Sequence, residues 1–303
     1  MNKPLSGIRI LDLTHMLSGP YCAMILADLG AETIKIEPLQ GEGTRKLLAS
    51  DPKNSLNGMG AYYITLNRNK QSVCIDLKSD AGKQVFYDLV KTSDVVINNF
   101  GADVPTRLGI DYATLAKINP RIITCSITGF GSDGPKYKRP AFDQVAQATG
   151  GGMSITGTDA NNPVRGGIPI GDLGGGMFAV MGIQSAIIER SISGTGQDVD
   201  ISMLDCQISM LNYMATMHFL SGENPYPIGN SHFVHVPYNT YKTADGFIVI
   251  AVITDNFWKN LNQVVMIPEF DDPQYDTQPG RWASKDYIDA KLNEILSQQS
   301  TAT

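Results

Sequence analysis

The chain has 303 residues, 42% apolar and 18% charged, a composition typical of a globular protein of about two domains. Its net charge is −6 without a long basic run, which argues against nucleic acid and anionic membranes and favours a small ligand. No apolar stretch reaches the ~18 residues of a membrane helix and no signal core is present, so we predict a soluble, cytoplasmic protein. Cysteine and histidine spacings predict neither disulfides nor a metal site.

The first half of the chain alternates short apolar runs with helical patterns. An apolar run at residues 8–13 precedes a loop, a helical stretch at 20–30 that Pro opens and Gly closes, and a second apolar run at 33–37. Further strand patterns lie at residues 72–77, 95–98 and 121–127, with helical patterns at 81–92 and 112–118. This alternation predicts an α/β fold with a mostly parallel, Rossmann-like sheet covered by helices.

The second half opens with a glycine-rich stretch, residues 166–176, that contains Asp172. An apolar helical pattern follows at 177–190, and a strand pattern at 197–201. Asp172 is therefore expected at a junction between a loop and a helix.

The composition changes from about Tyr226, where aromatic residues, Pro and Asn become frequent. Residues 241–252 predict a hairpin that turns at Ala244-Asp245-Gly246. We therefore predict two domains, a Rossmann-like one at 1–220 and a smaller α+β one at 221–303. A helical pattern at 285–296 runs into polar residues suited to cap a further helix, so we expect a C-terminally truncated chain.

Asp172 is the strongest candidate for chemistry. Its flanking glycines would let a ligand approach the carboxylate, and N–H groups at a helix start could bind a developing oxyanion. The helix dipole should keep this carboxylate ionised, as a nucleophile requires. The competing interpretation is a simple helix cap, and the motif alone favours the cap.

The loop at residues 14–20 follows the first strand, where open α/β sheets bind nucleotides. It lacks the G-x-G-x-x-G fingerprint, although Glu37 ends the second strand as an acid does in nicotinamide-dependent dehydrogenases. An ordinary loop, a nucleotide site and a dehydrogenase all stay open. Four cations are candidates for phosphate contacts, with surface solvation as the alternative: Arg68, Lys70, Lys78 and Arg107.

Several short motifs follow one another in order along essentially the whole chain. They are Leu5-Ser6-Gly7-Ile8-Arg9-Ile10-Leu11-Asp12, Ser18-Gly19-Pro20, residues 29–37, Asn69-Lys70, Asn98-Asn99-Phe100, Gly171-Asp172, Gly194-Thr195-Gly196-Gln197 and residues 241–246. Each motif is weak, but their order and spacing resemble the class III CoA-transferase family of the CaiB/BaiF type, which includes formyl-CoA transferase and carnitine CoA-transferase.

The resemblance implies transfer of CoA from an acyl-CoA thioester to a small carboxylic acid. Asp172 would attack the thioester, and the resulting mixed anhydride would become an aspartyl-CoA thioester that the acceptor acid resolves. It implies a homodimer of interlinked chains and no permanently bound cofactor, CoA or acyl-CoA being the substrate. By the same resemblance, residues 1–220 bind CoA and residues 221–303 form an incomplete substrate domain. The residues implied at the CoA site are His15, Leu17, Ser18, Asp76, Leu77, Lys78, Asn99, Phe100, Gly101 and Arg107, with Asp143 at an acidic position nearby.

Pro38 departs from the family pattern, because some relatives carry an Arg there that reaches the nucleotide phosphates. Three other cations are candidates to replace it: Lys35, Arg45 and Arg139. Residues 224–239 also lack the glycine-run loop of formyl-CoA transferase, which disfavours formate and oxalate as substrates.

Phe142 separates two branches of the family. The α-methylacyl-CoA racemase branch needs a His at this position, and Phe cannot transfer a proton. A racemase-like isomerase is therefore disfavoured, although it stays an alternative beside a non-catalytic CoA-binding protein.

Overall fold

The computed structural model describes residues 3–302 of the chain, which divides into two compact units. The first unit comprises Met1–Met153 and Arg165–Pro225, and the second comprises Ser154–Val164 and Tyr226–Thr303. Composition placed the boundary after residue 220. It gave no sign that residues 154–164 belong with the end of the chain, because that contact is not local in sequence.

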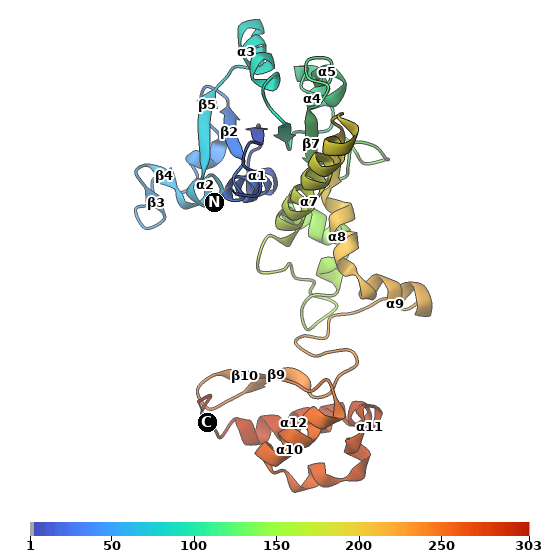
Figure 1. Cartoon of the computed structure of the whole chain (residues 1–303). Coiled ribbons are helices and arrows are strands. Elements are labelled where there is room, and N and C mark those ends of the chain that lie inside the picture. Colours follow the sequence, from blue (N-terminus) through green and yellow to red (C-terminus); the bar gives the residue numbers. More distant parts are fainter. Residues whose placement is uncertain (1–2, 303) are drawn as a thin grey trace. The chain divides into compact units, whose positions relative to one another are not determined.

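Six parallel strands form the sheet of the first unit (Figure 1). They are β1 (Arg9–Asp12), β2 (Glu32–Glu37), β5 (Lys70–Cys74), β6 (Val95–Asn98), β7 (Ile123–Thr128) and β8 (Asp198–Ser202). Their order across the sheet is β5-β2-β1-β6-β7-β8, with neighbours parallel throughout. The predicted α/β fold with a Rossmann-like sheet is confirmed. Because the winding direction reverses between β1 and β6, a ligand crevice is expected at their carboxyl ends.

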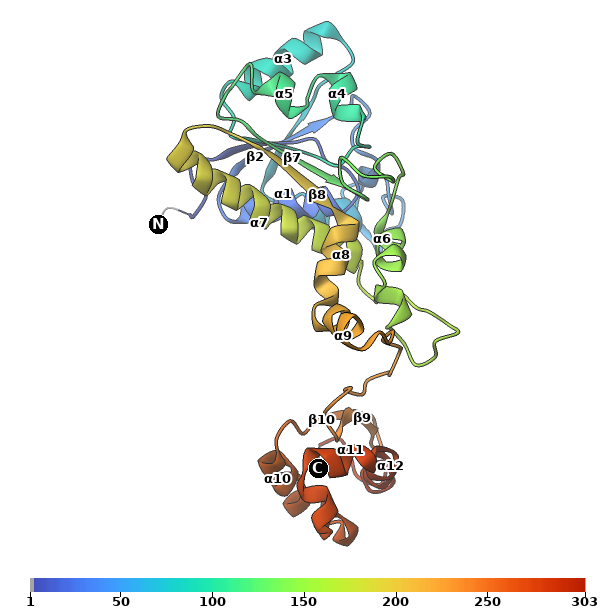
Figure 2. The same ribbon diagram turned by 90° about the vertical axis from the view of Figure 1, so that its right-hand side faces the viewer.

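Helices cover both faces of this sheet (Figure 2). α1 (Ser18–Asp28) and α7 (Ile170–Ser193) lie on one face, and α3 (Asp80–Val90), α4 (Val104–Leu108) and α5 (Tyr112–Leu115) lie on the other. α1 also packs directly against α7. The inner strands β1, β6 and β7 are thus buried on both faces, which explains why they read as nearly continuous apolar runs.

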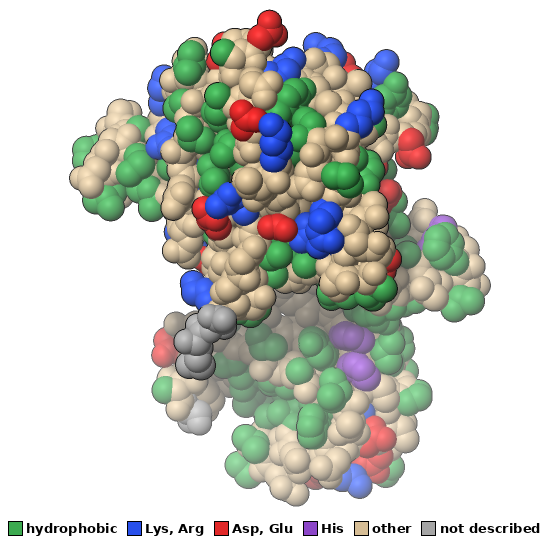
Figure 3. Space-filling view, turned by 45° about the horizontal axis from the view of Figure 1, so that its top comes forward, with side chains coloured by type: hydrophobic (Ala, Val, Ile, Leu, Met, Phe, Trp, Pro, Cys, Tyr) green, Lys and Arg blue, Asp and Glu red, His purple; other side chains and the backbone are tan. Residues whose placement is uncertain are grey.

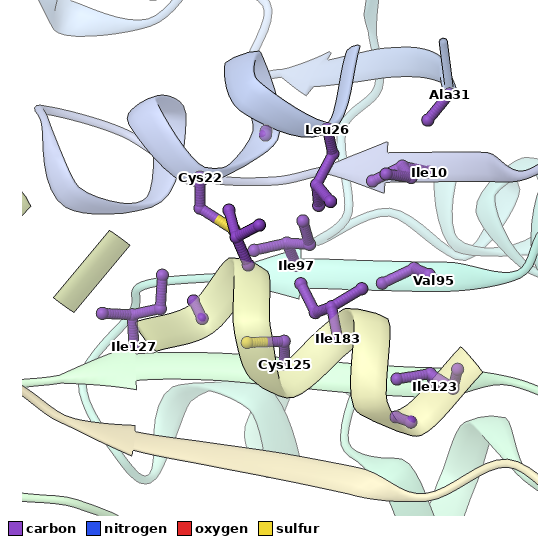
Figure 4. Packing of buried hydrophobic residues seen from close by; sticks show 14 of the residues in the cluster. Ile10, Cys22, Leu26, Ala31, Val95, Ile97, Ile123, Cys125, Ile127 and Ile183 are labelled. Atoms are coloured by element: carbon purple, nitrogen blue, oxygen red, sulfur yellow. The ribbon is translucent and has the colours of Figure 1, made fainter. Parts of the chain in front are cut away.

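Two apolar cores lie between the sheet and these helices, and side-chain alternation along each strand decides which core a residue enters. In β1, Ile10 belongs to the core between the sheet and helices α1 and α7, whereas Leu11 belongs to the core between the sheet and α3. Figure 4 shows the first core, where Cys22 and Leu26 of α1 and Ile183 of α7 close over the strands. These cores fix β1, whose end carries the loop of the site.

Helix α7 begins at Ile170, earlier than the apolar pattern at 177–190 predicted. By length and composition it could cross a membrane, but it lies on the sheet against α1, as the central helix of an α/β fold does. Its glycines permit this contact, because a Cβ built on Gly176 would lie 2.7 Å from the carbonyl oxygen of Ser18. Gly176 therefore admits a neighbouring helix, whereas the expectation that the glycines flanking Asp172 give a ligand access stays a prediction.

The first unit also contains shorter elements: η1 (Gly43–Arg45), β3 (Ser55–Leu56), β4 (Met59–Gly60), α2 (Ala61–Leu66), α6 (Asp143–Thr149), α8 (Met203–Leu211) and α9 (Tyr213–Ser221). The short η2 (Gly152–Ser154) lies at the boundary, with its last residue in the second unit. The second unit consists of the antiparallel hairpin β9 (Tyr238–Lys242) and β10 (Phe247–Ala251), followed by α10 (Asp255–Val265), η3 (Pro268–Asp271), η4 (Pro273–Asp276), α11 (Gln278–Ala283) and α12 (Lys285–Leu296). The hairpin predicted at 241–252 is confirmed. The core of the second unit surrounds Trp258, and the buried guanidinium of Arg281 lies over that indole ring.

Candidate active site

Two cavities open beside the carboxyl ends of the strands, where the strand order reverses. The large cavity, about 590 Å³, lies among the segments that follow β1, β2 and β5. The Asp172 cavity, about 280 Å³, contains the candidate nucleophile and the segments that follow β6 and β7. His15, Met16 and Phe100 line both cavities, so the two adjoin. The rings of His15 and Phe100 stack with their centroids 5.7 Å apart.

Most residues predicted to contact CoA line one or both of these cavities. The large cavity includes His15, Asp76, Leu77, Lys78 and Phe100. The Asp172 cavity includes His15, Ser18, Asn99, Phe100 and Gly101. Segments far apart in sequence are therefore brought to one crevice, as a ligand site requires, and each contact with CoA stays a prediction.

Two of the predicted CoA contacts lie elsewhere. Leu17 lines a separate apolar groove of about 600 Å³ that Leu173 also borders. Arg107 is 70% exposed on α4, with its guanidinium 3.5 Å from the carboxylate of Asp103, and it borders neither cavity. Both therefore rest on the family motif without support from the cavities.

Asp172 lies in the first turn of α7, and Asp143 occupies the amide groups of that turn. The Asp143 carboxylate accepts hydrogen bonds from the N–H of Gly171 at 2.8 Å and of Asp172 at 3.3 Å. The helix cap is Pro169, so the interpretation of Asp172 as a cap is wrong. The expectation that free amides here would bind an oxyanion is also wrong, because Asp143 takes them.

The electrostatics of Asp172 also differ from expectation. Burial raises the pKa of this carboxyl to about 6, and the negative charge of Asp143 adds to the rise. The helix dipole was expected to favour ionisation, but desolvation outweighs it. Asp172 is consequently ionised above about pH 6, and as a poorly solvated carboxylate it is suited to nucleophilic attack.

Tyr62 of α2 is a residue of the Asp172 cavity that the sequence did not reveal. Burial raises the pKa of its phenol to about 12, and the carboxylates of Asp172 and Glu42 contribute. The hydroxyl therefore stays protonated as a hydrogen-bond donor at neutral pH. No motif surrounds Tyr62, so only the packing of α2 beside the crevice identifies it.

The three cations considered as replacements for the family Arg at Pro38 have different surroundings. Lys35 is fully buried and donates to the carbonyl oxygen of Thr14 at 2.8 Å. Arg45 binds the carboxylate of Glu37 through two nitrogens, at 2.7 and 2.6 Å. Arg139 lines the Asp172 cavity and, within residues 3–302, forms no ion pair. It is the candidate best placed to meet a ligand anion.

Lys138 joins Arg139 in lining the Asp172 cavity and was missed, although the basic run at residues 136–139 was a signal. On the face that Figure 3 shows, basic and acidic side chains are interspersed. Surface charge on that face therefore does not mark a ligand site, and a cation is a candidate ligand contact only where it lines a cavity. Phe142 lines the same cavity, so a phenyl ring stands where a racemase would need an imidazole.

Comparisons with known proteins show the family of the chain. Residues 5–303 match the family model described as CoA-transferase family III. A succinate–glutarate CoA-transferase of Agrobacterium fabrum is 38% identical, covering 98% of this chain and 74% of the relative. An acetyl-CoA:oxalate CoA-transferase of Acetobacter aceti is also 38% identical, covering 99% of this chain and 76% of the relative.

Solved structures give the same result. The crystal structure of a CaiB/BaiF family protein from Brucella suis has a TM-score of 0.89 and 35% identity, covering 100% of this chain and 80% of that one. The reversing parallel sheet and the partly buried carboxylate in its crevice define a doubly wound α/β protein with a candidate ligand site at the switch point. The chain belongs to CoA-transferase family III, and its reaction is CoA transfer between an acyl-CoA and a carboxylate.

Proposed function

We propose that this chain transfers CoA through covalent intermediates on Asp172. The observation that carries the proposal is the placement of a partly buried carboxylate, its pKa raised to about 6, in a cavity that adjoins a larger one. The elongated acyl-CoA molecule would occupy the large cavity with its nucleotide part and present its thioester to Asp172. His15, Met16 and Phe100 would line the passage between the two parts.

The proposed reaction keeps the acyl energy on the enzyme through two activated species. An Asp172 oxygen attacks the thioester carbon, the C–S bond breaks, and CoA leaves as the thiolate with the electron pair. The thiolate then attacks the side-chain carbonyl carbon of Asp172, the anhydride C–O bond breaks, and the donor acid leaves as its carboxylate. An acceptor carboxylate reverses both steps and regenerates Asp172. No proton is gained or lost overall, and exclusion of water prevents hydrolysis.

Tyr62 is proposed to donate its hydroxyl hydrogen to oxygen atoms that become negative in these steps. It lines the same cavity as Asp172, and a phenol with a pKa of about 12 retains its proton at neutral pH. Such a donor would take the role that the α7 amides, already bonded to Asp143, do not have.

The acid substrate is proposed to be small. The Asp172 cavity is about 280 Å³, and Lys138 and Arg139 supply positive charge at its lining. The relatives named above act on succinate, glutarate and oxalate, which are all dicarboxylic acids. We therefore propose a small dicarboxylic acid. The prediction against oxalate, made from residues 224–239, stays untested, because the oxalate relative is as similar as the other one.

Trapping with hydroxylamine tests the covalent step. The protein is incubated with a panel of acyl-CoA donors and hydroxylamine, and the peptide that contains Asp172 is examined by mass spectrometry. The expected result is a hydroxamate on Asp172 in the unchanged protein and none in Asp172→Asn. An unmodified peptide from folded, CoA-bound protein would contradict the mechanism and favour a non-catalytic CoA-binding protein. Binding of NAD instead of CoA would favour a dehydrogenase.

The homodimer is proposed on separate grounds. Helix α7 exposes an apolar stripe along its length, formed by Met177, Met181, Ile188 and Ile192, of which the last is 79% exposed. Large apolar side chains exposed along one helix are typical of a subunit contact. Light scattering on the purified chain should give twice the monomer mass, and a monomer at micromolar concentration would exclude this assembly.

A further inference from the structure

Met16 has an unusual backbone conformation at the point where the two cavities adjoin. Its φ is 62°, in the left-handed region that residues other than glycine rarely adopt. It lines both the large cavity and the Asp172 cavity. A disfavoured conformation persists only where surrounding contacts impose it. The contacts of Met16 therefore determine the shape of the passage between the cavities.

The contact that holds Met16 comes from Glu42. The N–H of Met16 donates to Oε1 of Glu42 at 3.2 Å, and the same oxygen accepts the N–H of Thr44 at 3.1 Å. The other carboxylate oxygen accepts the hydroxyl of Thr44. Glu42 is only 5% exposed, and its own N–H donates to Glu37 at 2.7 Å. Its carboxylate is thus fixed before it reaches Met16.

The residue before Met16 is held from the opposite side. Asn99, which follows β6, accepts the N–H of His15 at 2.9 Å and donates to the carbonyl oxygen of His15 at 2.7 Å. With both ends of its side-chain amide engaged, Asn99 fixes the peptide of His15 as a neighbouring strand would. Because His15 cannot follow, any relaxation of Met16 has to occur at Met16 itself.

We propose that Glu42 is a positioning residue for the transferase reaction: it holds Met16 in the left-handed conformation and so keeps the passage between the two cavities open. This inference rests on the proposed function, in which CoA spans both cavities. Glu42 itself contributes no bond to the ligand. Its effect on CoA passes through the backbone of Met16.

Charge repulsion alone predicts the opposite effect of Glu42 on CoA affinity. Glu42 lines the large cavity, and a carboxylate there repels the phosphates of CoA. If Glu42 were only a nearby charge, its removal would tighten CoA binding. If it positions Met16, removal of its oxygen acceptors weakens binding, whereas removal of its charge alone does not.

The experiment measures the Kd for CoA by calorimetry in the unchanged chain and in variants shown to be folded by thermal melting. Glu42→Ala is expected to weaken binding about tenfold. Glu42→Gln keeps Oε1 for Met16, and its amide can donate to the Thr44 hydroxyl, so Kd should stay within about threefold. In a Met16→Gly background, where positive φ is accessible without strain, Glu42→Ala should cost less than about threefold.

The matched control is Leu48→Gly, which also replaces a residue with positive φ, at 65°, but one that lines neither cavity. It should leave the Glu42→Ala effect at its full size. Equal effects of Glu42→Ala in the Met16 and Met16→Gly backgrounds would overturn the inference, as would tighter binding in Glu42→Gln and Glu42→Ala alike. Failure of the unchanged chain to bind CoA would overturn the proposed function and this inference together. If the unchanged chain binds CoA but Glu42→Ala has equal effects with and without Met16→Gly, only the inference about Glu42 is overturned.

Discussion

The carboxylate of Asp143 accepts the backbone N–H of Asp172 at 3.3 Å, so an acidic side chain from α6 lies against the first turn of α7, where Asp172 itself stands. Asp143 also accepts the N–H of Gly171 at 2.8 Å and the side-chain amide of Gln147 at 2.8 Å. The negative charge of Asp143 opposes ionisation of Asp172 and adds to the rise of its pKa to about 6. The two carboxylates therefore have different roles: Asp143 orders the helix start, and Asp172 is left available for chemistry.

Asp143→Asn should move the acid limb of the pH profile of kcat/KM to lower pH. The substitution removes the negative charge that helps to raise the pKa of Asp172 to about 6, while the Asn oxygen can still accept the N–H of Gly171. Burial still acts on Asp172, so the pKa should not return fully to its ordinary value. Asp133→Asn, on an exposed loop, removes the same charge as a control and should leave the profile unchanged. A shift to higher pH would contradict this assignment.

Asp172→Asn should abolish transfer and make the protein more stable at neutral and alkaline pH. The pKa of Asp172 in the folded chain is about 6, above its ordinary value of 3.8, so the ionised carboxylate destabilises the fold. Above about pH 6 the variant should gain roughly 1 to 3 kcal/mol in free energy of unfolding, and the gain should vanish as pH falls below about 4. Denaturant titrations of the variant and the unchanged chain at about pH 8 and below about pH 4 measure this difference in free energy of unfolding. A loss of stability at about pH 8 would contradict the raised pKa.

The sheet was largely predictable because strands buried on both faces leave continuous apolar runs. The strand predicted at residues 95–98 has the bounds of β6, whereas the strand predicted at 72–77 lies at Lys70–Cys74. The latter is the edge strand of the sheet and is mostly exposed, so its apolar signal is weak. Burial on both faces thus separates the accurate prediction from the displaced one.

The candidate site was less predictable, because its geometry depends on contacts distant in sequence. The loop-to-helix junction expected at Asp172 is confirmed, because α7 begins at Ile170, although the apolar helical pattern starts only at residue 177 since glycine is a poor helix former. The packing of Gly176 against α1 is invisible in the local sequence. Asp172 was identified through the order of the family motifs, because its glycine-rich surroundings alone favoured a helix cap. Tyr62 and the Glu42–Met16 contact lie outside the family motifs and required the folded chain.

Gly176→Ala should destabilise the first unit. A Cβ at this position would lie 2.7 Å from the carbonyl oxygen of Ser18 and 3.0 Å from the ring of Tyr21, so α1 and α7 would have to separate. Overpacking of this kind costs about 1 to 3 kcal/mol. Gly167→Ala is the matched control, since nothing lies within 4 Å of its Cβ position. Thermal melts should show a lower Tm for the first variant alone, and equal Tm values would contradict the close helix contact.

Lys70→Met should destabilise the fold far more than an exposed Lys→Met substitution with similar pairing. The ammonium of Lys70 lies 2.8 Å from the carboxylate of Asp12, and both side chains are almost completely buried. Burial alone would raise the pKa of Asp12, but Lys70 and Lys35 hold it below its usual value, so Asp12 stays charged. Removing Lys70 leaves that charge poorly compensated, at a cost of about 3 to 5 kcal/mol. Lys91→Met breaks the exposed 2.6 Å pair with Asp88 and should lower the free energy of unfolding far less, because solvent screens that pair. Urea titrations of both variants measure the difference; similar losses would show that burial does not set the strength of the Asp12–Lys70 pair.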